Sequence, residues 1–171
     1  QNCDTIIHAA AMVSFNNEDA DLMHKINVEG TENIMNIAIS MGIKKVSYIS
    51  SIASLGRNST TEMVDENCYF RVSKKESNYS LSKYYSEQEV WRASQEGIDV
   101  VIINPSVILG PGDWTKGSSQ IFTKLYKGLK FYTTGSTGYV DVIDVANCAI
   151  LLLQSDIKNE RFIVNGANMK F

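Results

Sequence analysis

The stretch KVSYISS at residues 45–51 is a short apolar run that ends in two serines. A run of this length bounded by polar residues is typical of a buried strand. Similar runs occur at residues 4–10 and 98–103, and segments with helical spacing separate the three runs. Strands that alternate with helices predict right-handed βαβ units and a parallel sheet. The sequence therefore predicts an α/β fold with a parallel sheet covered by helices on both faces.

Two segments between these strands have apolar residues at helical spacing. Residues 17–41, stopped by Gly42, predict one long helix or two abutting helices. Their apolar positions are Leu22, Ile26, Ile34, Ile37, Ala38 and Met41. Residues 79–95, ended by Gly97, predict another helix. Its apolar positions are Leu81, Tyr84, Tyr85, Val90 and Trp91.

The chain changes character after residue 103. Pro105 cannot donate to a sheet ladder, so we expect the chain to leave the sheet at this residue. Beyond it we expect a short helix at 119–128, a small strand at 139–142, a helix at 144–154 capped by Asp144, and a last strand at 161–165. Residues 165–171 are expected to lead into a further helical region.

Composition restricts the class of protein. The chain has 171 residues, 44% of them hydrophobic and 20% charged, which suits one globular domain. A net charge of −3 gives no general attraction for nucleic acid or anionic membranes, so neither partner is expected. The cysteines, Cys3, Cys68 and Cys148, lack Cys-x-x-Cys spacing, which favours reduced thiols. Without a membrane-spanning run or a signal segment, the expected location is the cytoplasm.

Ser51, Tyr79 and Lys83 indicate carbonyl reduction or its reverse. Hydride added to a carbonyl leaves charge on oxygen, so one group must supply a proton and another must hold the oxygen. Tyr79 can supply the proton, and a lysine one helical turn later lies on the same face and favours the phenolate by its charge. Ser51 follows a strand, at the sheet edge where parallel sheets bind ligands. A second such pair, Tyr126 and Lys130, follows no serine-tipped strand and is assigned no role.

A series of motifs in order across nearly the whole chain carries a family resemblance. The motifs are His8-Ala9-Ala10-Ala11, Asn27-Val28-Glu29-Gly30-Thr31, Ser50-Ser51 followed by Gly56, Tyr79-x-x-x-Lys83, Asn104-Pro105-Ser106-Val107 with Gly110-Pro111-Gly112, and Tyr139-Val140-Asp141-Val142. Together they resemble the extended short-chain dehydrogenase/reductases, in the branch of dihydroflavonol reductases and aldehyde reductases. The resemblance implies a partial Rossmann-type, doubly wound parallel sheet. We treat residues 1–171 as a single domain, with βαβ units at 1–104 and substrate-side loops, helices and a strand at 105–171.

The resemblance also implies roles for individual residues. Tyr79 would be the catalytic acid/base, Lys83 would tune it and bind the nicotinamide ribose, and Ser51 would orient the substrate oxygen. Residues implied to line NAD or NADP are Ala9, Ala10, Ser50, Pro105, Ser106, Val107 and Ile108, besides Tyr79 and Lys83. The alternatives are a capping or turn serine for Ser51 and a surface pair for Tyr79 and Lys83. For Ala9, Ala10 and Ser50 the alternative is ordinary strand packing, and for residues 105–108 it is a strand-to-loop turn. We assign no metal.

Two further residues of these motifs have alternative interpretations. Asn27 would tie its helix to the site, or else be a structural asparagine. His8 at a strand end is interpreted as structural, and His24 is too remote in sequence to suggest a shared metal site.

One family feature is absent from the sequence. No Gly-x-Gly-x-x-Gly or Gly-x-x-Gly-x-x-Gly spacing occurs, so the turn that receives the cofactor pyrophosphate is missing. We therefore expect a piece of a longer enzyme that alone binds NAD or NADP weakly or not at all. We also expect an uncovered sheet edge, and hence association, for example as a homo-oligomer.

Three functions remain open at this point. The first is reduction of a ketone or aldehyde, or oxidation of the alcohol, on a small molecule whose apolar pocket Leu109, Trp114, Phe122 and Tyr132 could supply unless they only pack the core. The second is nucleotide-sugar epimerisation, which uses the same Ser, Tyr and Lys. Dehydration is disfavoured, because Ile52 and Ala53 stand where dehydratases of the family place an acidic pair. The third is a non-catalytic cofactor-sensing module.

Overall fold

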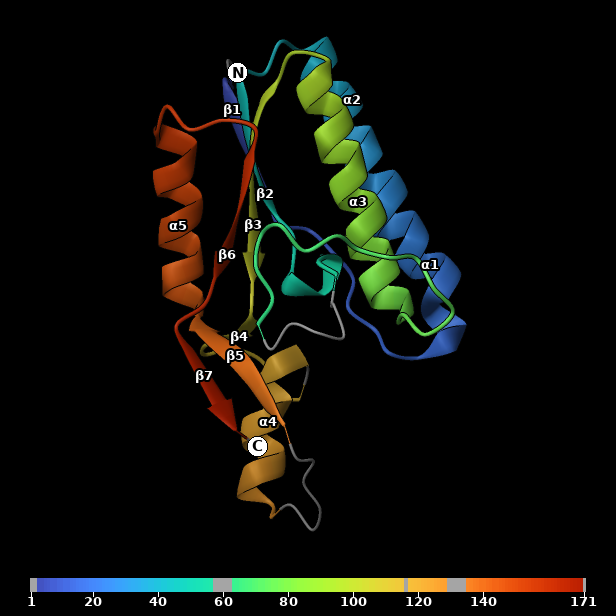
Figure 1. The fold of residues 1–171 in the computed structure, drawn as a ribbon, viewed down its shortest axis with the longest axis vertical. Coiled ribbons are helices and arrows are strands. Elements are labelled where there is room, and N and C mark those ends of the chain that lie inside the picture. The colour runs from blue at the N-terminus through green and yellow to red at the C-terminus, as the bar shows by residue number, and fades with distance from the viewer. Residues whose placement is uncertain (1–2, 57–62, 116, 129–134, 171) are drawn as a thin grey trace.

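The computed structural model describes residues 3–56, 63–115, 117–128 and 135–170. Its main sheet has four strands in the order β1-β2-β3-β6, all parallel. These strands are β1 (Thr5–His8), β2 (Lys45–Ile49), β3 (Asp99–Pro105) and β6 (Glu160–Val164). Figure 1 shows them between two layers of helix. The predicted α/β fold is confirmed, and β1 lies at an edge of this sheet.

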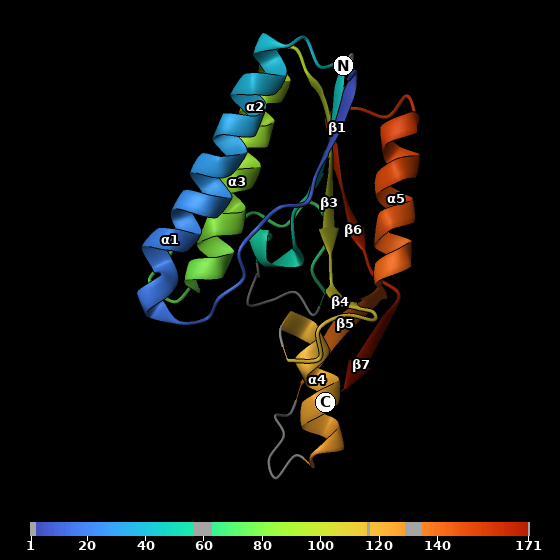
Figure 2. The ribbon, with the colours of Figure 1, turned by 180° about the vertical axis from the view of Figure 1, so that it is seen from behind.

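Helices cover both faces of the sheet, as predicted. One face carries the helical segment α1 (Ala20–His24), η2 (Lys25–Glu29) and α2 (Gly30–Ser40), together with α3 (Asn78–Gln95). The other face carries α5 (Val142–Gln154), and Figures 1 and 2 agree on this placement. An apolar core fills each interface, with Val46, Val100 and Ile102 on the α2–α3 side and Ile103 and Val145 on the α5 side.

The helical segment at residues 17–41 is as long as predicted but buries a different face. Its buried positions are Met23, Asn27, Thr31, Met35 and Ala38. Of the expected core residues, Ala38 is buried and Ile34 is half-buried against the core. The other four, Leu22, Ile26, Ile37 and Met41, are exposed. A four-residue spacing overshoots an α-helical turn of 3.6 residues, and the wider π-helical turn η2 absorbs the excess. The buried stripe therefore follows the four-residue repeat from Met23 to Met35.

Helix α3 also differs from its predicted pattern. The Ser77 side chain caps its start by accepting a hydrogen bond from the Ser80 backbone N–H. Its buried positions are Ser82, Lys83, Ser86, Glu87, Val90 and Ala93. Of the apolar positions predicted for its core face, only Val90 is fully buried, and Tyr85 is exposed. Periodicity failed here because most of the side chains that α3 buries are polar.

The chain leaves the main sheet at Pro105, as expected, because β3 ends there and the next strand belongs to another sheet. The expectation that Pro105 itself takes no part in the sheet is wrong. Strand β3 pairs with β6 as far as Pro105 and Val164, and the Ser106 N–H donates to the Val164 carbonyl at 3.0 Å. Alternate residues of a strand face opposite neighbours, so the Pro105 nitrogen faces β2, whose pairing with β3 ends at Ile49 and Ile103. Because no partner remains on that side, the missing N–H costs nothing.

A second, three-stranded sheet of order β4-β5-β7 lies beyond the end of β3 (Figure 1). It consists of β4 (Val107–Leu109), β5 (Ser136–Asp141) and β7 (Ala167–Lys170), with η4 (Gly117–Ser119) and α4 (Gln120–Tyr126) nearby. The helix near 119–128 and the strands near 139–142 and 161–165 are confirmed. The segment expected to lead into a further helical region contains β7, which pairs antiparallel with β5, and the helical region itself stays a prediction.

Helix α5 begins two residues earlier than predicted. Its cap is Asp141, whose carboxylate accepts from the Ile143 N–H at 2.7 Å, and the prediction of Asp144 as the cap is wrong. Among the described residues, no helix is both long and apolar enough to cross a membrane.

Candidate functional site

The predicted site residues follow the carboxyl ends of three neighbouring parallel strands. Ala9 and Ala10 come after β1, Ser50 and Ser51 after β2, and Ser106 after β3. The carboxyl ends of parallel strands meet at one edge of a sheet, which is where such sheets bind ligands. The topology therefore gathers segments that are far apart in the sequence.

Ser51 has a free proton to offer a ligand. Its side chain caps the short helix η3 (Ile52–Ser54) by accepting the Ala53 N–H at 3.1 Å. A hydroxyl that accepts one bond still has its own hydrogen to donate. The capping alternative is thus realised, but it leaves the O–H of Ser51 available.

Tyr79 lies in the first turn of α3. Burial raises the pKa of the Tyr79 phenol, and the nearby Ser51 side chain lowers it in smaller part. Its ring also meets the Phe15 ring edge-on, with centroids 5.9 Å apart. Tyr79 therefore stays protonated at neutral pH, which is the form that can donate a proton to an oxygen.

Lys83 is buried one turn further along α3, with 2% of its surface exposed. Its ammonium donates to the Ile49 carbonyl at 2.9 Å and to the Tyr48 hydroxyl at 3.1 Å, and it lies 4.8 Å from the Tyr48 ring centre. Burial lowers the pKa of Lys83 to about 8, against an opposing effect of the Glu87 charge. The lysine is therefore held at the end of β2 by groups of the protein.

The electrostatic effect expected of Lys83 on Tyr79 is not what the structure shows. The sequence suggested that the ammonium would favour the phenolate, whereas the pKa of Tyr79 is raised and the influences on it are burial and Ser51. The Lys83 ammonium instead donates to the Tyr48 hydroxyl and to the Ile49 carbonyl.

The residues predicted to line the cofactor differ in burial. Ala9 and Ala10 are exposed, Val107 and Ile108 are half-buried in β4, and Pro105 is buried. The Ser50 hydroxyl is buried and donates to a Glu87 carboxylate oxygen at 2.8 Å.

The buried Ser106 hydroxyl has no hydrogen-bond partner among the described residues. An unpaired buried hydroxyl at the end of β3 suits a polar ligand group at this edge of the sheet. The residues present therefore fit a bound nicotinamide cofactor, and their roles stay a prediction.

Asn27 and His8 hold neighbouring segments together. The Asn27 amide pairs with the backbone of Met12, accepting from its N–H at 2.7 Å and donating to its carbonyl at 2.9 Å, and it also donates to Ser82 at 3.0 Å. It thereby fastens the loop after β1 to α3. His8 is hydrogen-bonded to Thr31 at 3.0 Å, and burial, with Lys83 second, lowers the pKa of its ring. In the described part of the chain, no group of acidic, histidine and cysteine side chains could hold a metal.

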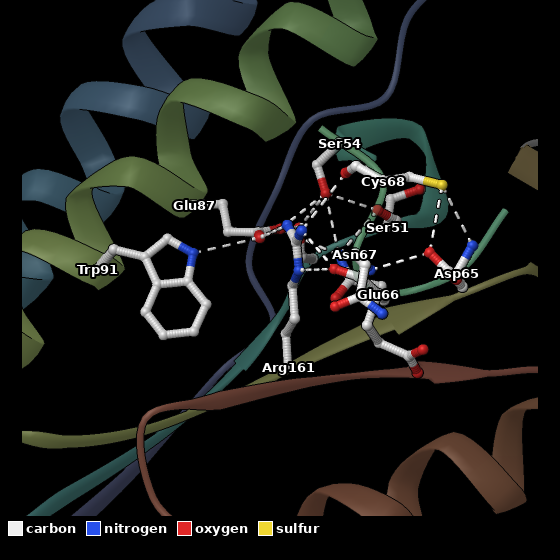
Figure 3. Close-up of polar contacts among 11 residues, drawn as sticks. Ser51, Ser54, Asp65, Glu66, Asn67, Cys68, Glu87, Trp91 and Arg161 are labelled. Atoms are coloured by element: carbon white, nitrogen blue, oxygen red, sulfur yellow. Dashed lines mark hydrogen bonds and ion pairs between the residues drawn. The ribbon is translucent and has the colours of Figure 1, made fainter. Parts of the chain in front are cut away.

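Sequence reasoning missed Glu87, which is almost completely buried and lies near Ser54, Trp91 and Arg161 (Figure 3). It follows Lys83 by one helical turn, so Tyr79, Lys83 and Glu87 recur every four residues on one face of α3. That spacing was a signal available in the sequence.

Of the residues suggested for an apolar pocket, Trp114 and Phe122 make an edge-on ring contact, and Leu109 is half-buried in β4. Tyr132 lies outside the described residues, as does Lys130 of the second Tyr-Lys pair, whose Tyr126 is almost fully exposed.

Comparisons with known proteins agree with this arrangement. A family model for NAD-binding proteins, described as male sterility protein, matches residues 1–152. The putative dihydroflavonol 4-reductase of Synechocystis is 33% identical over 175 residues, covering 99% of this chain and 51% of the relative. Cinnamoyl-CoA reductase 1 of Petunia hybrida is 31% identical over 171 residues, covering 94% and 50%.

Among solved structures, the crystal structure of gox2253 is 34% identical and superimposes with a TM-score of 0.85, covering 98% of this chain and 52% of that one. The chain thus spans about half the length of the relatives it matches. The strand order, the motifs and these matches lead to one conclusion: the chain belongs to the extended short-chain dehydrogenase/reductases, within the NAD-binding family described as male sterility protein.

Proposed function

We propose that the full-length protein containing this chain is an NAD(P)-dependent oxidoreductase that reduces a ketone or aldehyde to the alcohol, or runs the reverse reaction. The observation that carries the proposal is the placement of Ser51 just after β2 and near enough to Tyr79 to lower the pKa of its phenol, with Lys83 buried one helical turn away. The matches to a dihydroflavonol reductase and a cinnamoyl-CoA reductase favour reduction over nucleotide-sugar epimerisation.

Each side chain has a defined part in this proposal. When bound, the reduced nicotinamide supplies the hydride that reaches the carbonyl carbon. Tyr79 gives its phenolic proton to the carbonyl oxygen, and Ser51 donates a hydrogen bond to the same oxygen. In the oxidative direction Tyr79 takes the proton back from the alcohol.

The cofactor would lie along the carboxyl edge. Ala9, Ala10 and Ser50 would line it, Lys83 would bind the ribose, and the backbone of residues 105–108 would face the nicotinamide. The small side chains of the two alanines allow close approach, and their exposure leaves room for it. The choice between NAD and NADP and the identity of the carbonyl compound stay open in the proposal.

Replacing the catalytic tyrosine tests the proposal most directly. In the full-length protein, Tyr79→Phe should lower kcat by about 10²- to 10⁴-fold, because the phenol is the only proton donor that the proposal gives the substrate oxygen. Cofactor affinity, measured by calorimetric titration with NADP and NAD, should change little. Turnover is measured with aldehydes, flavonoid-like ketones and nucleotide-sugars, so that reduction and epimerisation are separated.

The chain offers a matched control in its second Tyr-x-x-x-Lys pair. Tyr126 is almost fully exposed, so Tyr126→Phe should leave kcat within about twofold. Turnover by Tyr79→Phe equal to that of this control would reject the catalytic role and leave the non-catalytic cofactor-sensing module as the better account.

A further inference from the structure

We propose that Glu87 is a positioning residue that fixes the backbone of Ser51 through Ser54 and Asn104, and that Arg161 extends this connection to the segment at residues 65–68. The inference rests on the proposed function, because Ser51 matters only where its hydroxyl meets a substrate oxygen. Four contacts of the described residues carry it: three end on the Glu87 carboxylate, and the fourth joins Asn104 to the Ser51 carbonyl. Figure 3 shows Ser54 and Arg161 pointing toward Glu87.

The Glu87 carboxylate is 1% exposed and receives donors on both oxygens. Its Oε2 accepts from Ser50 at 2.8 Å, from Ser54 at 2.7 Å and from Asn104 at 3.0 Å. Its Oε1 accepts from Arg161 at 3.1 Å and from Trp91 at 3.4 Å. A buried carboxylate without such partners would carry a large desolvation cost, so these contacts determine where Glu87 can lie.

Two of these donors also hold Ser51. The Ser54 hydroxyl lies 2.8 Å from the Ser51 carbonyl, and the Asn104 amide donates to the same carbonyl at 3.1 Å. Ser54 has one hydrogen to share between Glu87 and that carbonyl, whereas the Asn104 amide has two and can serve both. Loss of the carboxylate would release both groups at once, and the Ser51 peptide with them.

Arg161 connects the carboxylate to a distant part of the chain. From β6 its guanidinium donates to Glu87 and to the Glu66 carbonyl, at 2.9 Å from Nε and 2.6 Å from Nη2. The Glu66 side chain in turn accepts the Ile163 N–H at 2.8 Å. The segment at 65–68 lies between Ser51 and α3 in the sequence. Arg161 contacts this segment and the Glu87 carboxylate, and the carboxylate in turn contacts Ser54, which bonds to the carbonyl of the proposed catalytic Ser51.

The decisive variant is Glu87→Gln in the full-length enzyme. Glutamine keeps the volume, but its NH₂ group faces donors that need an acceptor. We expect kcat to fall by about 10- to 100-fold, as for a small misplacement of a catalytic group, while KM for the cofactor changes less than about threefold. A fall of this kind with a nearly constant KM is the result expected of a positioning residue.

The pH profile gives a readout that a purely structural role would not move. The Glu87 charge opposes the fall in the pKa of Lys83, so its removal should shift the alkaline limb of the kcat profile to lower pH. Glu89→Gln is the matched control, since Glu89 is on the same helix and pairs with Arg92 outside the site. It should leave both kcat and the profile unchanged.

A crystal structure of the Glu87→Gln variant supplies a readout that does not depend on turnover. We expect the Ser51 carbonyl to shift and the Ser51 hydroxyl to move away from the Tyr79 phenol. If the variant does not fold, Ser54→Ala removes one bridge to the Ser51 carbonyl and should lower kcat by about three- to tenfold without moving the pH profile.

An unshifted Ser51 in the Glu87→Gln crystal structure, or unchanged kcat in the variant that folds, would overturn the inference. If the wild-type enzyme also shows no turnover, that result counts against the proposed function alone. The crystal structure of the variant would still decide the role of Glu87.

Discussion

The two sheets of this molecule differ in how they are held. In the four-stranded sheet, β3 is buried along nearly its whole length, and helices cover both faces. In the three-stranded sheet, β7 is exposed at every residue and β4 is half-buried throughout. Of the three predicted catalytic residues, Ser51 follows β2 of the first sheet, and Tyr79 and Lys83 lie on α3, which packs against β3. The difference teaches that the predicted catalytic residues are held by the well-buried part of the molecule, here called the rigid part, and not by the second, more exposed sheet.

The interior of the rigid part contains polar as well as apolar side chains. Its apolar interior has Met35, Val46 and Ile102 at 0% exposure, yet α3 presents Ser82, Lys83 and Glu87 to the same interior. Buried polar groups of this kind are stable only when they are hydrogen-bonded, and the contacts of Lys83 and Glu87 meet that condition. Such a network specifies one arrangement of the site more strictly than apolar packing does.

The largest expected effect tests whether the two sheets differ in stability. Ile102→Ala removes a fully buried side chain from β3 and should lower the free energy of unfolding by about 2–5 kcal/mol. Met169→Ala in β7 removes a side chain that is 46% exposed and should change it by no more than about 0.5 kcal/mol. Both are measured by urea unfolding of the full-length protein. Equal losses would show that the second sheet is as tightly built as the first.

The second expected effect is a pH dependence of the free energy of unfolding, caused by the buried Lys83 on α3. The pKa of Lys83 is about 8 in the folded state and 10.5 in the reference state. Between these values the unfolded chain binds more protons, so stability rises with pH, by roughly 3 kcal/mol in total. Below pH 8 both states hold the proton and the cost of burying the charge is fully present.

The measurement compares wild type with Lys83→Met. Methionine carries no proton, so the difference in unfolding free energy between the two proteins should move in favour of wild type as the pH rises from about 8 to 10.5. The Tyr48 phenol has a pKa raised to about 12, so it lowers the free energy of unfolding as the pH rises above about 10. Because Tyr48 is present in both proteins, this effect is common to both. A pH-independent difference would mean that Lys83 is less desolvated than its contacts indicate.

Much of the rigid part could be predicted from the sequence because its signals are local. Apolar runs marked β1, β2 and β3, and the serine at the end of β2 marked the edge of the sheet. The spacing of Tyr79 and Lys83 placed both on α3. What failed was the prediction of which faces are buried, because Asn27, Thr31, Ser82 and Glu87 are polar and hydrophobic periodicity cannot detect them.

The second sheet was harder to foresee for a different reason. The pairing of β7 with β5 joins residues near 168 to residues near 138, and no local pattern marks a contact at that separation. The pairing of Pro105 with β6 depended on where β2 ends, which a single strand does not reveal. Glu87 carried a helical spacing with Lys83, but its partner Arg161 is far along the chain.

The smallest expected effect is on kcat/KM, and it tests whether the loop after β1 or the region of the second sheet and α4 selects the substrate. Phe15 is 81% exposed, yet its ring meets the Tyr79 ring at 62°. Asn16 caps the short helix that follows, and Asn27 holds Met12 just before it, so the loop presents Phe15 in a fixed place. A planar substrate held by Tyr79 would meet this ring.

Phe15→Leu should therefore lower kcat/KM for benzaldehyde by about two- to tenfold, the value of one aromatic contact, and leave that for butanal within about twofold. Phe122→Leu is the matched control from the other region, because Phe122 contacts Trp114 instead. A larger change in the ratio of the two kcat/KM values for Phe122→Leu would mean that the second sheet and α4 choose the substrate. An equal change would mean that the pocket spans both regions, and a change confined to Phe15→Leu would assign selection as well as chemistry to the rigid part.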